Sequence, residues 1–125
     1  MTPIGVDHVV LEVKDVERSL AFYCGVLGLT PERADLFRQG RVPFASARAA
    51  GSLIDLFPAD RPGDGPPHFC LAFEEPIAEL VQELAAHGIQ VEPPESRYGA
   101  QGAGDSVYVQ DPDGHTVEIR SYTSK

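Results

Sequence analysis

Two histidines that lie sixty residues apart have the side-chain type and the spacing of a repeated metal site. His8 lies in the segment VDHVVL and His68 in the segment PHFCL. The same sixty-residue shift places Gly28 on Gly88, so the two halves of the chain repeat a pattern. An internal repeat defines the unit of folding. Because neutral imidazole is a common ligand of divalent metals, the repeat also pairs two candidate ligands by symmetry.

Strand alternation predicts where these histidines point. In the first strand, Val9 and Leu11 are suited to pack under a helix, which sends His8 to the opposite face of the sheet. The same alternation in the strand 68–73 sends His68 to that face. A single histidine on an apolar strand is more often structural, but the coincidence of both with the repeat favours a shared cavity.

Each repeat also ends in a strand that carries a carboxylate. Asp55 in the strand 52–57 and Glu118 in the strand 116–122 fall on the histidine face by the same alternation. Two imidazoles with one or two carboxylates suit Mn²⁺, Fe²⁺, Ni²⁺ or Zn²⁺ and leave coordination positions open for a substrate.

The elements that position these residues form two βαβββ repeats. We expect an α+β fold, a curved antiparallel sheet with its helices outside and a metal or substrate cavity inside. The single domain spans 1–125, with repeat one at about 4–58, a linker at 59–67 and repeat two at about 68–122. The expected strands are 4–13, 42–49, 52–57, 68–73, 90–92, 106–110 and 116–122, and the expected helices follow Asp15 to Gly28 and Glu75 to Gly88.

Composition excludes several classes of partner. A net charge of −9 argues against nucleic acid and anionic membrane surfaces, which need basic patches. No apolar run approaches the roughly 20 residues of a membrane span, and no signal peptide is visible at the N-terminus. We therefore expect a cytoplasmic protein with Cys24 and Cys70 as reduced core thiols.

Five segments together resemble the vicinal oxygen chelate superfamily, which includes glyoxalase I, fosfomycin-resistance proteins, extradiol dioxygenases, methylmalonyl-CoA epimerase and bleomycin-binding proteins. The segments are Asp7–Val13, Ser19–Leu29, Leu53–Phe57, His68–Leu71 and Val107–Ile119. The most specific are the Phe-Tyr…Leu-Gly-Leu and Asp-Pro-Asp-Gly…Glu patterns. They cover nearly the whole chain and indicate the superfamily and fold far more strongly than an activity.

The resemblance implies a metal triad of His8, His68 and Glu118. Asp55 lies where glyoxalase I-like members have a glutamate as fourth ligand. Aspartate is one methylene shorter, so Asp55 is interpreted as a base, a group that supports the ligands or a solvent-bridged ligand.

The stretch Arg97–Gly102 looks like a loop found in a small subgroup close to virulence-associated and glyoxalase-domain-containing proteins. It is either a lid or substrate contact or a plain connector. The candidate substrate-binding residues are Arg97, Tyr98, Tyr108 and Arg120.

Other polar residues carry weaker hypotheses. His87 ends a helix, where a basic residue suits the helix dipole, and His115 follows a turn and is expected to be solvated. Tyr122 could reach the cavity, and Arg41 and Arg48 are weaker candidates for anion binding.

The resemblance implies a metal-dependent lyase, isomerase or thiol transferase of the glyoxalase I-like type, acting on a small vicinally oxygenated substrate. Glu118, or with less support Asp55, would move a proton. An extradiol-type dioxygenase is the alternative enzyme, although such enzymes commonly have a second pair of repeats. A metal-free, bleomycin resistance-like binding protein is the alternative of another class, although those binders usually lack the triad. We expect a homodimer, whose repeats pair within one chain or are swapped between two.

Overall fold

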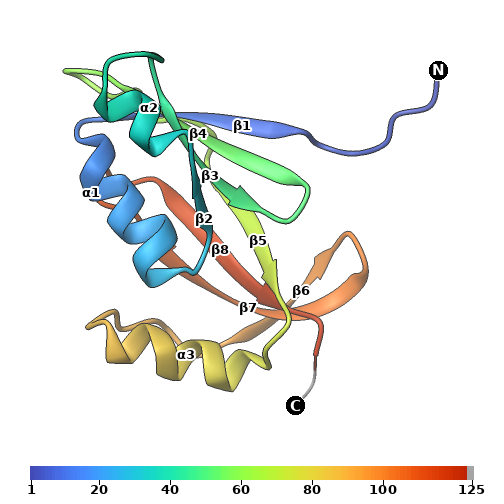
Figure 1. The fold of residues 1–125 in the computed structure, drawn as a ribbon. Coiled ribbons are helices and arrows are strands. Elements are labelled where there is room, and N and C mark those ends of the chain that lie inside the picture. The colour runs from blue at the N-terminus through green and yellow to red at the C-terminus, as the bar shows by residue number, and fades with distance from the viewer. Residues whose placement is uncertain (124–125) are drawn as a thin grey trace. The chain divides into compact units, whose positions relative to one another are not determined.

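The computed structural model describes residues 1–123, which divide into two compact units. Unit 1 is Met1–Gly65 and unit 2 begins at Pro66. Each unit is built on its own four-stranded sheet (Figure 1). The predicted α+β architecture of two βαβββ repeats is confirmed.

Unit 1 consists of β1 (His8–Val13), α1 (Val16–Leu20), the π-helical turn η1 (Ala21–Val26), β2 (Thr30–Glu32), α2 (Ala34–Arg38), β3 (Ala45–Ala49) and β4 (Ser52–Pro58). Its strand order is β1-β4-β3-β2. Unit 2 consists of β5 (Phe69–Phe73), α3 (Ile77–Ala86), β6 (Glu95–Gly99), β7 (Gly102–Gln110) and β8 (Thr116–Ser121). Its strand order, β5-β8-β7-β6, repeats that of unit 1.

Both sheets are mixed rather than purely antiparallel. The outer strands β1 and β5 pair in parallel with β4 and β8, whereas the remaining neighbours are antiparallel. A parallel pair needs a long crossover, and the helix with the following hairpin provides it in each unit. The expected antiparallel pairing therefore holds only for the three strands that follow each helix.

The helices begin and end near the predicted residues. Asp15 caps α1, because its Oδ1 accepts hydrogen bonds from the backbone N–H groups of Glu17 and Arg18 at 3.0 and 3.2 Å. The predicted helix is continuous up to Leu27, although its second half is a π-helical turn. Gly28 then has a φ of +82°, a left-handed conformation that favours glycine after a helix.

The alternation of apolar residues buries one face of each sheet. Leu11 of β1 is fully buried, and α1 lies against β4 and β3. In unit 2, Val117 and Ile119 of β8 are fully or almost fully buried, and α3 contacts β7. The opposite face of each sheet is left for polar side chains.

The predicted strand 90–92 is wrong. Those residues form no strand, and the edge strand β6 begins only at Glu95. Pro93 and Pro94 lack the N–H group that a ladder needs, so pairing starts after them. The stretch Arg97–Gly102, predicted as a loop, instead forms the end of β6 and the tight turn into β7.

Candidate metal-binding half-sites

In unit 1, the sheet places one histidine beside one carboxylate. His8 lies opposite Leu53 in the parallel pair of β1 and β4, and Asp55 is two residues further along β4 on the same face. Nε2 of His8 is 3.9 Å from Oδ2 of Asp55. The imidazole is half-exposed, whereas Asp55 is 7% exposed. His8 and Asp55 are called the unit 1 half-site below.

Two neighbours orient this pair. Nδ1 of His8 donates a hydrogen bond to the Asp7 carboxylate at 2.8 Å. This bond raises the pKa of His8 above its usual value, and Asp55 adds to the effect. It also leaves Nε2 as the atom with a free lone pair, as in metal-binding histidines whose other nitrogen is held by a carboxylate. Ser46 Oγ donates to Oδ1 of Asp55 at 2.7 Å, so Oδ2 is the oxygen that faces His8.

Unit 2 repeats this arrangement. Phe69 lies opposite Val117 in the parallel pair of β5 and β8, so His68 and Glu118 stand in the same relation as His8 and Asp55. Nε2 of His68 is 3.3 Å from Oε1 of Glu118. Glu118 is 5% exposed and the imidazole is half-exposed. His68 and Glu118 are called the unit 2 half-site below.

Arg120 donates hydrogen bonds to the second carboxylate oxygen of Glu118. Its Nε and Nη2 donate to Oε2 at 3.1 and 3.0 Å. Nη1 and Nη2 also donate to the carbonyl oxygens of Arg97 and Tyr98 at 3.0 and 3.1 Å. Burial alone would lower the pKa of Arg120, but the hydrogen bonds to Glu118 outweigh it and raise the pKa. Only Oε1 of Glu118 is left facing His68.

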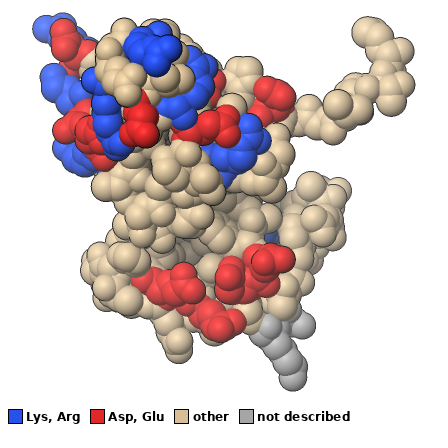
Figure 2. Space-filling view, viewed as in Figure 1, with Lys and Arg blue, Asp and Glu red and all other residues tan. Residues whose placement is uncertain are grey.

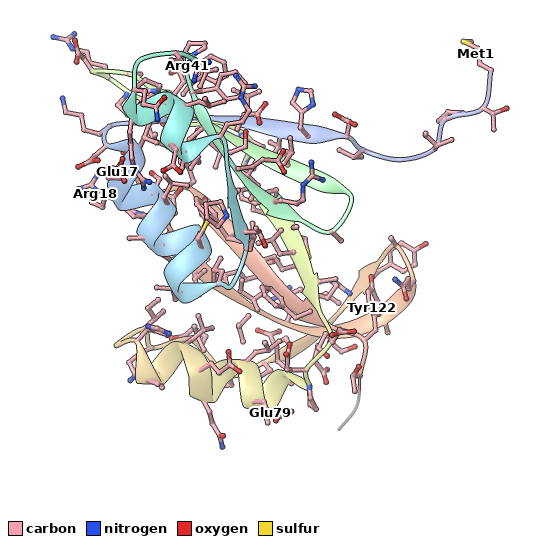
Figure 3. The ribbon with its side chains drawn as sticks, viewed as in Figure 1. Met1, Glu17, Arg18, Arg41, Glu79 and Tyr122 are labelled. Atoms are coloured by element: carbon pink, nitrogen blue, oxygen red, sulfur yellow. The ribbon has the colours of Figure 1, made fainter. Side chains whose placement is uncertain are left out.

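The hairpin of β6 and β7 packs closely on Arg120 because it carries glycine there. A Cβ atom on Gly99 would lie 2.6 Å from Nη1 of Arg120, and one on Gly104 would lie 2.9 Å from it. Tyr122, which follows β8 and is labelled in Figure 3, accepts a hydrogen bond from the backbone N–H of Gln101 at 3.2 Å. The glycines thus let the turn rest on the residues that support Glu118.

Tyr108 and Arg97 complete the surroundings of the unit 2 half-site. The Tyr108 ring meets the His68 ring edge to face at a centroid distance of 5.4 Å. Its hydroxyl donates to Oε1 of Glu118 at 3.5 Å. The Arg97 guanidinium lies over the Tyr108 ring, 5.2 Å from its centroid. The structure therefore brings Arg97, Tyr108 and Arg120 together here.

Tyr98 contributes only its backbone to this group. Its carbonyl oxygen accepts from Arg120, whereas its side chain is 90% exposed. By strand alternation that side chain lies on the other face of the hairpin from Arg97.

The cysteines and His115 differ from the sequence-based expectations. Cys70 is exposed and lies opposite Glu118 in the sheet register, and Cys24 is only partly buried, so neither is a fully buried core thiol. Although the residue as a whole is exposed, partial burial of its thiol and the charge of Glu118 raise the pKa of Cys70. His115 was expected to be solvated but is 4% exposed. The turn that precedes it is tight: the Asp111 carboxylate accepts hydrogen bonds from the backbone N–H of His115 and Asp113.

The remaining weak candidates lie apart from both half-sites. His87 directly follows α3 and is exposed. Arg48 donates to both oxygens of Glu32 at 2.7 and 3.1 Å, and the pair lowers the pKa of Glu32. Arg41 is exposed and makes a long hydrogen bond of 3.5 Å with Gln39.

Sequence reasoning missed two of the supporting residues. Asp7 could have been found, because a carboxylate directly before a histidine is a visible signal. Ser46 could not, since only the register of β3 against β4 places it opposite Asp55.

The donor chemistry of the half-sites fits a divalent metal ion. Each offers one imidazole nitrogen and one carboxylate oxygen, a set that suits Mn²⁺, Fe²⁺, Ni²⁺ and Zn²⁺. Within residues 1–123, no three His, Cys, Asp or Glu side chains group closely enough to hold an ion. Since such ions take at least four ligands, neither half-site is a complete site by itself.

A separate cavity of about 610 Å³ lies in unit 1 between α1, η1 and α2. Its lining includes Glu17, Cys24 and Arg38 and none of the predicted site residues. No helix among the described residues is long and apolar enough to cross a membrane.

Comparison with known proteins places this geometry in context. The family model described as Glyoxalase/Bleomycin resistance protein/Dioxygenase superfamily matches residues 5–119. The virulence protein STM3117 of Salmonella typhimurium is 36% identical over 94% of this chain and 83% of its own length. Its crystal structure superposes with a TM-score of 0.83, covering 98% of this chain and all of that one.

Two further relatives carry names that refer to glyoxalase chemistry. The glyoxalase domain-containing protein RDO1 of Mycosarcoma maydis is 33% identical over 94% of this chain and 68% of its own length. A probable lactoylglutathione lyase of Synechocystis is 28% identical over 94% of this chain and 95% of its own length.

Proposed function

Because the chain belongs to the Glyoxalase/Bleomycin resistance protein/Dioxygenase superfamily, we propose that it is a divalent-metal-dependent enzyme of the glyoxalase I-like type. It acts on a small, vicinally oxygenated substrate as a lyase, an isomerase or a thiol transferase. One observation carries this proposal: the same pairing of a histidine with a carboxylate occurs at the same register position in both sheets.

In this proposal His8, His68 and Glu118 are the protein ligands of the ion. The donor atoms would be the two imidazole nitrogens Nε2 and the carboxylate oxygen Oε1, which also accepts the long hydrogen bond from Tyr108. The bound ion would polarise the vicinal oxygens of the substrate and stabilise an oxyanion.

The protein's own side chains hold these donors and move the proton. Arg120 keeps Glu118 in one orientation, with Oε1 toward His68. Ser46 does the same for Asp55, whose Oδ2 stays available. A proton that leaves the substrate is accepted by Asp55 through Oδ2, or by Glu118, whose Oε1 would then have to leave the ion.

The chain is proposed to act as a homodimer. The Pro- and Gly-rich segment 60–67 is long enough for the repeats to pair within one chain or to be exchanged between two. Light scattering of the purified protein measures the mass directly, and a monomer at micromolar concentration would contradict the proposal.

A substrate panel tests the activity. The metal-loaded protein is incubated with the hemithioacetal of methylglyoxal and glutathione, with an epoxide and a thiol, and with a catechol under oxygen. Turnover of either thiol-dependent substrate that is lost in His68→Ala supports the proposal. Oxygen uptake with the catechol would favour the dioxygenase alternative. Bleomycin that raises the melting temperature in EDTA, with no turnover anywhere, would favour the metal-free binding protein.

A further inference from the structure

Between Pro66 and Thr123, the Lys and Arg side chains lie only on the face of the half-site. Between Pro66 and Thr123 the sequence has ten Asp and Glu residues but only two Lys or Arg residues, Arg97 and Arg120. Figure 2 shows the acidic surface near α3, where Asp and Glu gather and Lys and Arg are nearly absent. Arg97 contacts Tyr108, and Arg120 contacts Glu118. Among the described residues of unit 2, this face is therefore the part that repels an anion least.

The two arginines differ in how much hydrogen-bonding capacity is used. Arg120 is 4% exposed and donates to Glu118 and to two carbonyl oxygens. Arg97 makes one ion pair, in which its Nη2 is 3.4 Å from Oε2 of the mostly exposed Glu95. Arg97 is thus the cation of this face that retains donors for a ligand.

Two buried polar groups at Arg97 and the neighbouring Ser106 have no hydrogen-bond partner. Arg97 lies opposite Gly104, yet its guanidinium reaches the Tyr108 ring four residues further along β7. Its side chain therefore crosses the position of Ser106, which is on the same face. Among residues 1–123, Nε of Arg97 and Oγ of Ser106 are buried and have no hydrogen-bond partner, and Ser106 is 2% exposed. Unpaired buried donors cost free energy that an acceptor would recover.

Unit 1 lacks this combination. Arg48 also lies on a sheet strand, β3, but its guanidinium already donates to both oxygens of Glu32. Within residues 1–123, the buried donors without a partner are therefore found only beside the unit 2 half-site.

We propose that Arg97, with Ser106, binds an oxyanion of the substrate, a carboxylate or a phosphonate, beside Tyr108, His68 and Glu118. The fork of the guanidinium matches two oxygens of such a group. This inference rests on the proposed function and narrows its substrate class to vicinally oxygenated molecules that carry a negative charge.

The test compares ligands that differ in the anion alone. The protein, stripped of metal with EDTA, is titrated with lactate, with 1-hydroxyethylphosphonate and with propane-1,2-diol, and binding is followed by amide NMR shifts. We expect at least one anion to bind roughly tenfold more tightly than the diol. Arg97→Gln should remove this difference, Arg97→Lys should retain part of it and Glu95→Gln should increase it. Arg61→Gln, which removes one equivalent charge from an exposed residue of unit 1, is the control and should leave it unchanged.

Equal affinity for the anions and the diol, or a difference that persists in Arg97→Gln, would overturn the inference. Arg97→Lys keeps the test valid if Arg97→Gln does not fold. Divalent metal titrations of the same samples separate the two proposals. Metal binding without a preference for anions contradicts this inference alone, and an Arg97-dependent preference without metal binding contradicts the proposed function alone.

Discussion

Each candidate carboxylate has one oxygen held by the protein and one that faces a histidine. The holding group differs: a neutral hydroxyl from Ser46 binds Asp55, and a guanidinium from Arg120 binds Glu118. The separation from the imidazole differs too, 3.9 Å for Asp55 against 3.3 Å for Glu118. The shorter aspartate is therefore the better candidate for proton transfer and the glutamate for metal ligation.

The first prediction separates these two roles. Glu118→Gln should weaken binding of a divalent metal at least about tenfold, because a charged ligand is lost. Asp55→Asn should leave metal affinity within about threefold and lower kcat by roughly a hundredfold or more, as expected for loss of a general base. Metal titration and steady-state kinetics measure both. Equal losses of metal affinity in the two variants would make Asp55 a ligand.

The second prediction concerns the buried ion pair of Arg120 and Glu118. Arg120→Met leaves the Glu118 charge buried without its partner, which should lower the free energy of unfolding by about 3 kcal/mol. Denaturant unfolding measures the loss. The double variant Arg120→Met with Glu118→Leu should recover part of it, and failure to recover any would show that the pair is not the cause.

At the scale of elements, Arg120 links the hairpin of β6 and β7 to the unit 2 half-site, because it donates to carbonyl oxygens of β6 and to the Glu118 carboxylate. The sequence predicts a loop at Arg97–Gly102, but it could not reveal that Gly99 and Gly104 face a buried guanidinium. That contact depends on the register of β6, β7 and β8. Predictions from alternation succeeded for long apolar strands and failed at the edge strand β6, where polar residues and two prolines hide the pattern.

The third prediction tests the close packing of this hairpin. Gly104→Ala would place a Cβ atom 2.9 Å from Nη1 of Arg120 and 3.0 Å from the carbonyl oxygen of Ser121. We expect it to lower the free energy of unfolding by about 1–3 kcal/mol through overpacking. Gly51→Ala is the matched control, since no atom lies within 4 Å of a Cβ there. Similar effects of both substitutions would contradict the account.

The fourth prediction concerns the ion pair between α1 and α2. Arg38 donates to both oxygens of Glu17, which is labelled in Figure 3, at 2.8 Å each. This pair lowers the pKa of Glu17, so its stabilisation is present at neutral pH and is lost as the pH falls through that lowered value. Glu17→Gln should lower the melting temperature slightly at pH 7 and by less as the pH falls through the acidic range. Adding Arg38→Gln to this variant should change little, and a fully additive effect would exclude the pair.

At the scale of the whole molecule, two units repeat one geometry but not one set of residues. The sixty-residue repeat in the sequence predicted the two structural repeats. Strand alternation predicted that both histidines lie on the sheet face away from the helices, because alternation and helix spacing are local properties. Neither could predict Ser46 as a support, the burial of His115 or the free donors of Arg97, because these depend on register and on packing between strands.

The central claim is that the histidine of each unit serves a divalent metal site. Calorimetric titration of the metal-free protein with Mn²⁺, Ni²⁺ and Zn²⁺ tests it directly, with His8→Ala, His68→Ala and the exposed control His87→Ala in parallel. The account predicts saturable binding of at least one ion by the wild type and by His87→Ala, weakened at least about tenfold in each of the other two variants. No binding by the wild type, or binding that neither His8→Ala nor His68→Ala weakens, would contradict it.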